Sequence, residues 1–198
     1  NNAAVTCSSS DYETHVGGVI GNNKFGISIE AKNNGKVSGT YTYNDCIGGI
    51  VGNSSASLTL NAENYGSISG YYVGGIVGAT EMSEVTGVDL SDMTVDGKGN
   101  YTGGFCGQLG YNGNSRERII TNARITGTDV YDTNGRVTES TTTIKGNNYV
   151  GGFVGHTHQK VSNGYISSQT TPELFVDEIV VSGLQRLGGA FGGTYTNM

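Results

Sequence analysis

Charged side chains that could act on a polysaccharide gather in one part of the sequence. They are Arg116, Glu117, Arg118 and Arg124, followed by Asp129 and Asp132. Cleaving a glycan needs two or three carboxylates that converge on one groove, or a basic side chain beside a metal. Mixed charges next to an insertion more often form surface ion pairs, and we favour that interpretation. A carbohydrate-active enzyme, a polysaccharide lyase or glycoside hydrolase, stays as the alternative.

Two other segments offer ligand atoms for a metal. Residues 129–135 form an oxygen-rich stretch before a glycine, as calcium loops do. His156 and His158 alternate along one strand, so both rings would lie on the same face. The histidines have no third ligand beside them, and a solvated acidic turn accounts for the aspartates. The same interpretation holds for Asp89, Asp92 and Asp96. We therefore predict no catalytic, cofactor-binding or metal-binding residue.

The three cysteines match no zinc-binding spacing. Cys106 occupies a repeat position where other copies have Ile, Val or Phe, which predicts a buried free thiol. Cys7 and Cys46 could instead pair across neighbouring turns, and the sequence leaves this open. Asn53 and Asn100 begin glycosylation sequons, which matter only in a eukaryotic secretory pathway.

The composition is typical of a secreted all-β chain. The 198 residues include 34 glycines and one proline, and only 14% are charged, against roughly 25% in an average soluble domain. The net charge of −6 and the lack of a basic face argue against a nucleic-acid partner. No apolar run approaches the ~20 residues needed to span a bilayer, so we expect no membrane insertion.

One pattern, Gly-Gly-apolar-apolar-Gly, recurs along the whole chain. It occurs at residues 17–21, 48–52, 74–78, 103–107, 151–155 and 188–192. The first glycines of successive copies are 31, 26, 29, 48 and 37 residues apart. Phosphate-binding glycine loops lead into a helix, and calcium β-rolls repeat a nonapeptide with an aspartate, so neither fits. A repeat that runs from end to end predicts a single domain, residues 1–198.

The shortest interval shows what one repeat contains. The glycine stretch is followed by an alternating segment, as at residues 58–62, and then by a short segment ending in glycine, as at 68–70. Equivalents of the alternating segment are expected at 27–31, 88–90, 121–125 and 161–166, and of the short one at 5–7, 37–39, 95–97, 144–146 and 181–183. Three short strands per repeat predict a parallel β-helix, an all-β solenoid of about six coils. A β-sandwich is the rival, but hairpins would not make every third strand alike.

The two longest intervals predict two loop insertions. Extra residues fall at 126–143 and at 167–177, the second of which contains Pro172. Proline is tolerated in a loop but not in a central strand. We therefore expect both loops to project from the solenoid.

The glycine stretch poses a question of geometry. Val73 and Ile76 have opposite strand parity, so a straight strand would turn one apolar row outward, as a surface for self-association. Glycine in a strand often marks a bend or bulge, and a bend would let both rows face the core. We expect the bend, and the exposure of Phe105 and Phe153 decides between the two.

The six copies resemble the GLUG motif. They read Gly-Gly-Ile-Val-Gly at 48–52 and 74–78, and Gly-Gly-Phe-Val-Gly at 151–155. This motif occurs in tandem in bacterial cell-surface proteins, including adhesin-like proteins and the non-catalytic part of IgA-cleaving metallopeptidases. The His-Glu-x-x-His zinc motif of those peptidases is not in this sequence, so proteolysis does not carry over. The resemblance implies a non-enzymatic structural or adhesive role at the cell surface, with a host or matrix glycan or protein as ligand.

Strand-like segments lie close to both ends of the sequence, at residues 5–7 and 187–192, without an amphipathic helix to cap them. An uncapped coil of a solenoid is an exposed sheet edge. We expect either that the chain is a piece of a larger extracellular protein or that copies associate end to end into a filament.

Overall fold

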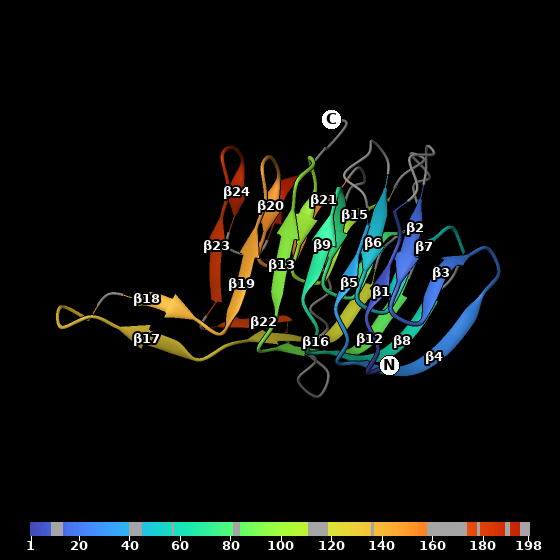
Figure 1. The fold of residues 1–198 in the computed structure, drawn as a ribbon, viewed down its shortest axis with the longest axis horizontal. Helices are drawn as coiled ribbons and strands as arrows, with labels where there is room; N and C mark the ends of the chain where they lie inside the picture. Colours follow the sequence, from blue (N-terminus) through green and yellow to red (C-terminus); the bar gives the residue numbers. More distant parts are fainter. Residues whose placement is uncertain are drawn as a thin grey trace.

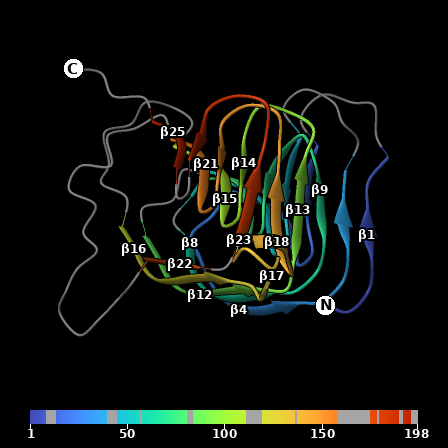
Figure 2. The same ribbon diagram turned by 90° about the vertical axis from the view of Figure 1, so that its left-hand side faces the viewer.

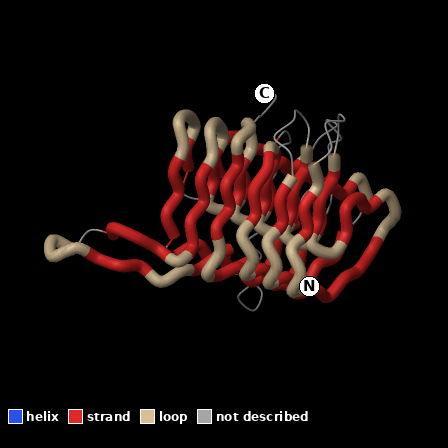
Figure 3. Tube along the Cα trace, viewed as in Figure 1, coloured by secondary structure: helices blue, strands red, loops and turns tan. Residues whose placement is uncertain are grey.

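The computed structural model of the chain is an all-β parallel solenoid, as the repeat predicts (Figure 1). It describes residues 1–8, 14–39, 45–56, 58–80, 84–110, 119–135, 137–157, 174–177, 179–188 and 191–194. Figure 3 shows that this part of the chain is built of strands and loops without a helix. None of these residues therefore belongs to a helix long and apolar enough to cross a membrane.

Equivalent strands of successive coils pair in parallel and build four sheets, which we call A to D. Sheet A contains β1 (Val5–Thr6), β5 (Val37–Ser38), β9 (Ile68–Gly70), β13 (Thr94–Gly97), β19 (Thr142–Lys145) and β23 (Ile179–Ser182). Sheet B contains β2 (His15–Gly17), β6 (Cys46–Gly48), β10 (Tyr72–Gly74), β14 (Thr102–Gly103), β20 (Val150–Gly151) and β24 (Leu187–Gly188). Sheet C contains β3 (Ile20–Asn23), β7 (Val51–Ser54), β11 (Val77–Thr80), β15 (Cys106–Leu109), β21 (Val154–Thr157) and β25 (Phe191–Thr194). Sheet D contains β4 (Ile27–Asn33), β8 (Leu58–Asn64), β12 (Glu84–Ser91), β16 (Ile119–Thr126) and β22 (Leu174–Asp177).

The expected bend in the glycine stretch is confirmed, and it divides that stretch between sheets B and C. In the third coil, β10 ends at Gly74 and β11 begins at Val77. Val73, Ile76 and Val77 are all fully buried, so both apolar rows face inward. Phe105 and Phe153, the deciding residues, are also 0% exposed. The outward apolar row that a straight strand would have offered for self-association does not form in these coils.

Sheets B and C lie so close that only glycine fits at the motif's last position. A Cβ atom on Gly78 would lie 2.4 Å from the backbone nitrogen of Ile47 and 2.6 Å from the carbonyl oxygen of Gly52. Real Cβ atoms do not approach backbone atoms so closely, and backbone cannot move aside as a side chain can. We call this pair of closely packed strands the glycine arch.

The core is enclosed by the bend of the arch, sheet A and sheet D. Sheet D lies at the bottom of the view in Figure 2. Polar side chains inside the coils are also repeated. Asn33 Nδ2 donates to Asn64 Oδ1 at 2.8 Å, and Asn23 Nδ2 donates to the Ser54 hydroxyl at 2.9 Å. All four of these side chains are buried, so the amides satisfy one another and the turn backbone away from water.

The structure confirms the first insertion and corrects the second. β17 (Asp129–Tyr131) and β18 (Val137–Ser140) form an antiparallel hairpin that projects from the solenoid (Figure 1). Residues 174–177 were expected in the second loop, but they form β22 and pair with β16, with Ile125 opposite Val176. The strand expected at 161–166 and Pro172 lie outside the described residues.

Candidate functional site

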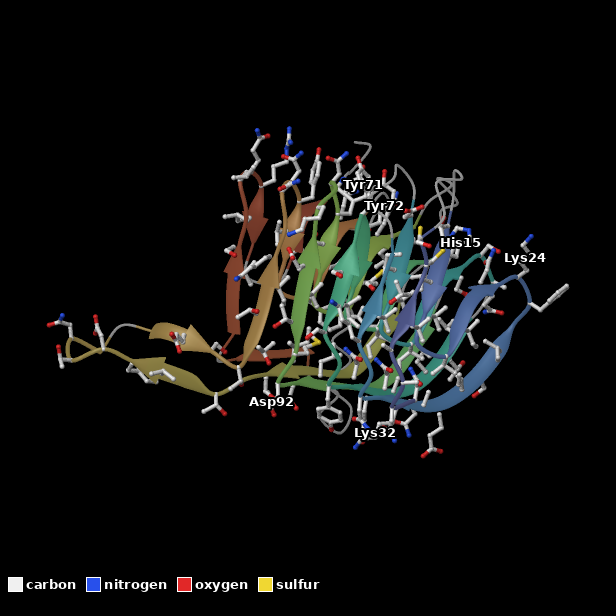
Figure 4. All side chains as sticks on the ribbon, viewed as in Figure 1. His15, Lys24, Lys32, Tyr71, Tyr72 and Asp92 are labelled. Atoms are coloured by element: carbon white, nitrogen blue, oxygen red, sulfur yellow. The ribbon has the colours of Figure 1, made fainter. Side chains whose placement is uncertain are left out.

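A row of tyrosines runs along the edge where the chain turns from sheet A into sheet B. Tyr72 begins β10, and Tyr101 and Tyr149 directly precede β14 and β20. Val73 pairs with Thr102, and Thr102 pairs with Val150, so the three tyrosines occupy one position in three successive coils. We call these three residues the tyrosine ladder. In the view of Figure 4, Tyr71 and Tyr72 lie along the edge of the molecule opposite Lys32 and Asp92.

The rings of the ladder contact one another from coil to coil. The ring centroids of Tyr72 and Tyr101 are 4.8 Å apart, and those of Tyr101 and Tyr149 are 5.4 Å apart. The Arg186 guanidinium continues the row, 4.6 Å from the ring centroid of Tyr149. All three tyrosines are partly exposed, so the ladder is a surface feature that the core does not enclose.

His156, one of the two histidines considered above as metal ligands, packs beneath the tyrosine ladder. It lies in β21, is 5% exposed, stacks on Tyr101 at 4.8 Å and meets Tyr149 edge-on at 4.6 Å. Burial raises the pKa of the Tyr101 phenol, and the neighbouring Tyr149 and Tyr71 add to the effect. The Tyr101 phenol is therefore a neutral hydrogen-bonding group at physiological pH. His158 lies outside the described residues.

A second row, made of amides, runs beside the ladder. Asn100 and Asn148 each precede a ladder tyrosine, and Asn148 Nδ2 donates to Asn100 Oδ1 at 3.1 Å. Asn147 Nδ2 donates to the Lys98 carbonyl oxygen at 2.5 Å and fixes the turn. In the coils of Tyr101 and Tyr149, neutral donors and acceptors therefore lie on both rows. The second sequon thus begins within this surface, at Asn100.

The backbone is left-handed at one ladder tyrosine and at the arginine that continues the row. Tyr149 has φ 43° and Arg186 has φ 52°. Residues other than Gly, Asn and Asp rarely adopt this conformation, because Cβ crowds the backbone. A tyrosine and an arginine in such positions suggest that the side chain has a role that outweighs its backbone cost.

Most of the charged cluster weighed as an alternative site for glycan cleavage lies outside the described residues. Arg116, Glu117 and Arg118 lie outside the described residues, and of Arg124 only the backbone, in β16, is described. The acidic segment at 129–135 comprises β17 and the turn of the hairpin. There the Asp132 carboxylate accepts the Asn134 backbone N–H at 2.8 Å and so closes its own turn.

Asp92 and Asp96 have ordinary surface surroundings, whereas of Asp89 only the backbone, in β12, is described. Asp92 is exposed, at a turn with φ 51°. The Asp96 carboxylate pairs with the Lys98 ammonium at 2.6 Å. Within the described part of the chain, no three His, Cys, Asp or Glu side chains lie close enough to hold a metal ion.

The buried thiol predicted at Cys106 is confirmed. Its side chain is 0% exposed and donates to the Gln108 carbonyl oxygen at 3.1 Å. Burial raises the pKa of this thiol far above its ordinary value. Cys7 and Cys46 are free thiols, so the structure does not contain the disulfide that was left open between them. Asn53, the first sequon asparagine, lies in β7 and donates to Asn22 Oδ1 at 3.3 Å.

A hollow of about 470 Å³, which no sequence pattern predicts, lies on the outer face of sheet D. It is lined by Glu30, Ala31, Lys32, Asn61 and Glu63. Lys32 Nζ lies 2.9 Å from Glu63 Oε2 and 4.6 Å from the ring centroid of Tyr65. The hydrogen bond between Lys32 and Glu63 raises the pKa of Lys32 and lowers that of Glu63, so both side chains stay charged at neutral pH.

Comparison of the chain with family profiles, curated proteins and solved structures found no match in any of the three.

Proposed function

We propose that the chain is a non-enzymatic structural and adhesive module of an extracellular, cell-surface protein. The observation that carries this proposal is the repetition of one buried column and one glycine arch through the coils. The tyrosine ladder gives the module an exposed surface with which to adhere. The resemblance of the glycine motif to GLUG repeats supports the location.

The repetition suits a spacer. Parallel strands advance by about 4.8 Å per coil, so six coils extend roughly 30 Å. Interior strands of sheets A to C pair on both sides, and the buried amides link neighbouring coils. Each coil is thus supported by its neighbours, and the length of the rod follows from the number of coils.

Among the described residues, the hollow on sheet D is a second place to consider for the carbohydrate-active alternative, besides the charged cluster near the 126–143 insertion. A glycosidase acid needs a raised pKa to hold its proton at neutral pH, but the pKa of Glu63 is lowered. A lyase base must be able to accept a proton, but the raised pKa of Lys32 keeps its ammonium protonated. These two side chains serve each other as an ordinary surface ion pair, so we favour the non-enzymatic role.

Two measurements on the purified chain test the proposal. Beads coated with the chain should be retained on layers of mucin or extracellular matrix more than beads coated with albumin. Incubation with soluble glucan, xylan, galactomannan and polygalacturonate should release neither new reducing ends nor unsaturated uronates. A defined cleavage product, or no retention on any layer, would refute the proposed function.

We also propose that the coils at the two ends of the described stack can associate with a second copy. Strands β1 to β4 pair on one side only, as do β23, β24, β25 and β22. Phe25 in the first coil is 83% exposed and Leu184 in the last is 80% exposed, and such exposed apolar groups at an unpaired sheet edge favour pairing.

A further inference from the structure

We infer that the tyrosine ladder binds a glycan chain that lies along the solenoid axis. The inference rests on the proposed adhesive function and specifies its ligand. The ladder, the amides beside it and Arg186 form one continuous strip across successive coils. Neither the core nor the repeat explains why this strip is aromatic.

A comparison of the coils within the chain supports a role outside the core. The strand register places His15 and Cys46 in the same column as Tyr72. Coil geometry therefore accepts imidazole, thiol, phenol and guanidinium at this position, whereas the glycines of the arch recur in every copy of the motif. Three tyrosines in successive coils are a property of this surface and are not required by the fold.

The chemistry of the strip matches a polyhydroxylated ligand. Tyrosine offers an apolar ring and a hydroxyl at a low cost in conformational entropy, and amides both donate and accept hydrogen bonds. The pKa of Tyr101 keeps its phenol neutral, and the Asn100–Asn148 pair shows that both amides are oriented along the strip. Sugars present apolar C–H groups and vicinal hydroxyls, which need both kinds of partner.

The spacing of the strip suits a polymer. Ring centroids repeat at 4.8 and 5.4 Å along the ladder. One sugar unit of an extended glycan has nearly this length, so successive sugars can meet successive tyrosines. A ligand with several repeating contacts gains affinity from each one, because the later contacts form within an existing complex.

Other classes of macromolecule fit this strip less well. A nucleic acid would need several cations for its phosphates, and among the ladder, its amides and Arg186 only the arginine is charged. A protein interface is centred on a desolvated apolar patch. Here the tyrosines are flanked by amides and follow a single narrow row.

The left-handed backbone at Tyr149 allows binding to be separated from folding. Glycine adopts this conformation freely, so Tyr149→Gly removes the ring and relieves the backbone at once. If the ring serves binding, this variant should melt no lower than Tyr149→Ala and should still lose affinity. If the ring serves only the fold, affinity should remain while the melting temperature falls.

The experiment is affinity electrophoresis of the full chain in native gels that contain hydroxyethylcellulose, xylan, galactomannan or polygalacturonate. We expect at least one polymer to retard the chain. Tyr101→Ala with Tyr149→Ala removes two of the three ladder contacts and should weaken that retardation about tenfold or more. Tyr131→Ala, which removes a 55% exposed tyrosine on the hairpin, is the matched control and should retain binding. Arg186→Ala should weaken binding to polygalacturonate more than to neutral polymers.

Each outcome decides the inference. Retardation that depends on the ladder supports it. No retardation by any polymer, or equal retardation of the double variant, overturns it, even if coated beads still adhere and the proposed function stands. A change in sedimentation of the double variant without glycan binding would identify the ladder as a protein interface and also overturn it. Cleavage of a bound polymer would refute the proposed non-enzymatic function instead.

Discussion

The asparagines that link coils inside the solenoid provide a sharp test of how the fold is held together. Asn64 is fully buried, and its Oδ1 accepts from Asn33 Nδ2 at 2.8 Å and from the Gly66 backbone N–H at 3.3 Å. Its Nδ2 donates to the Gly66 carbonyl oxygen at 3.0 Å. Asn64→Ala would therefore leave both backbone groups of Gly66 without these partners in a buried turn.

The expected cost follows from these bonds. Leaving a buried polar group unsatisfied costs about 1–3 kcal/mol. The two backbone groups of Gly66 lose their side-chain partner here, and one N–H of Asn33 loses an acceptor. Water that enters the space left by the side chain recovers part of this, so we expect a loss of about 3 kcal/mol. In a domain of this size, that loss lowers the melting temperature by roughly 6–12 °C.

The matched control is the asparagine pair on the outside of the solenoid. Asn53 Nδ2 donates to Asn22 Oδ1 at 3.3 Å, but this pair is exposed to water. Asn53→Ala should therefore change the stability by no more than about 0.5 kcal/mol. Urea unfolding followed by circular dichroism, supported by calorimetry, measures both variants. Equal losses in the two variants, or a loss under about 1 kcal/mol for Asn64→Ala, would refute the reasoning.

Three more predictions concern the core, the ladder and the ends. Phe153→Ala removes a fully buried ring stacked 5.0 Å from Phe105 and should cost about 3–5 kcal/mol in urea unfolding. The raised pKa of Tyr101 predicts stability that is complete below the unfolded pKa, about 10, and declines as the pH rises toward the folded pKa. Absorbance titration should show a late-ionising phenol that Tyr101→Phe removes. Phe25→Asp and Leu184→Asp should each weaken concentration-dependent association in sedimentation without lowering the melting temperature, and unchanged association would exclude end-to-end stacking.

The bend at the glycine pair could be predicted because the sequence contains a conflict that only a bend resolves. Val73 and Ile76 cannot both face the core of a straight strand, and glycine is the residue that permits a sharp change of direction. The buried Phe105 and Phe153 bear this out. Local pattern was sufficient here because the constraint lies within a few residues.

The prediction that the second loop extends over residues 174–177 is wrong, because pairing between coils, and not local pattern, decides which segment joins a sheet. The strand predicted at 161–166 lies outside the described residues. The structure pairs residues 174–177 with β16 in sheet D. A single short apolar segment cannot distinguish possible registers, since each satisfies the same period.

The tyrosine ladder could not be predicted from the sequence, because its three residues are unevenly spaced along the chain. Tyr72 and Tyr101 are separated by one ordinary repeat, but the hairpin insertion places Tyr149 much farther along the sequence. The repeated Asn-Tyr dipeptides at 100–101 and 148–149 were the available signal. These dipeptides take equivalent positions in neighbouring coils only if the hairpin residues are left out of the repeat length. That step requires knowing that the hairpin projects outside the coil.

The glycine arch and the ladder are consequences of the same geometry. Side chains cannot enter the space between sheets B and C, because a Cβ on the motif's last glycine would meet backbone atoms. The edges of the arch can vary among coils, because their side chains lie outside this space. The position that precedes each glycine stretch lies on such an edge, and it holds a different kind of side chain at the two ends of the stack than in the middle. Because glycine is required only within the arch, the residue on its edge can change from one coil to the next. In this chain, that residue is tyrosine in three successive coils.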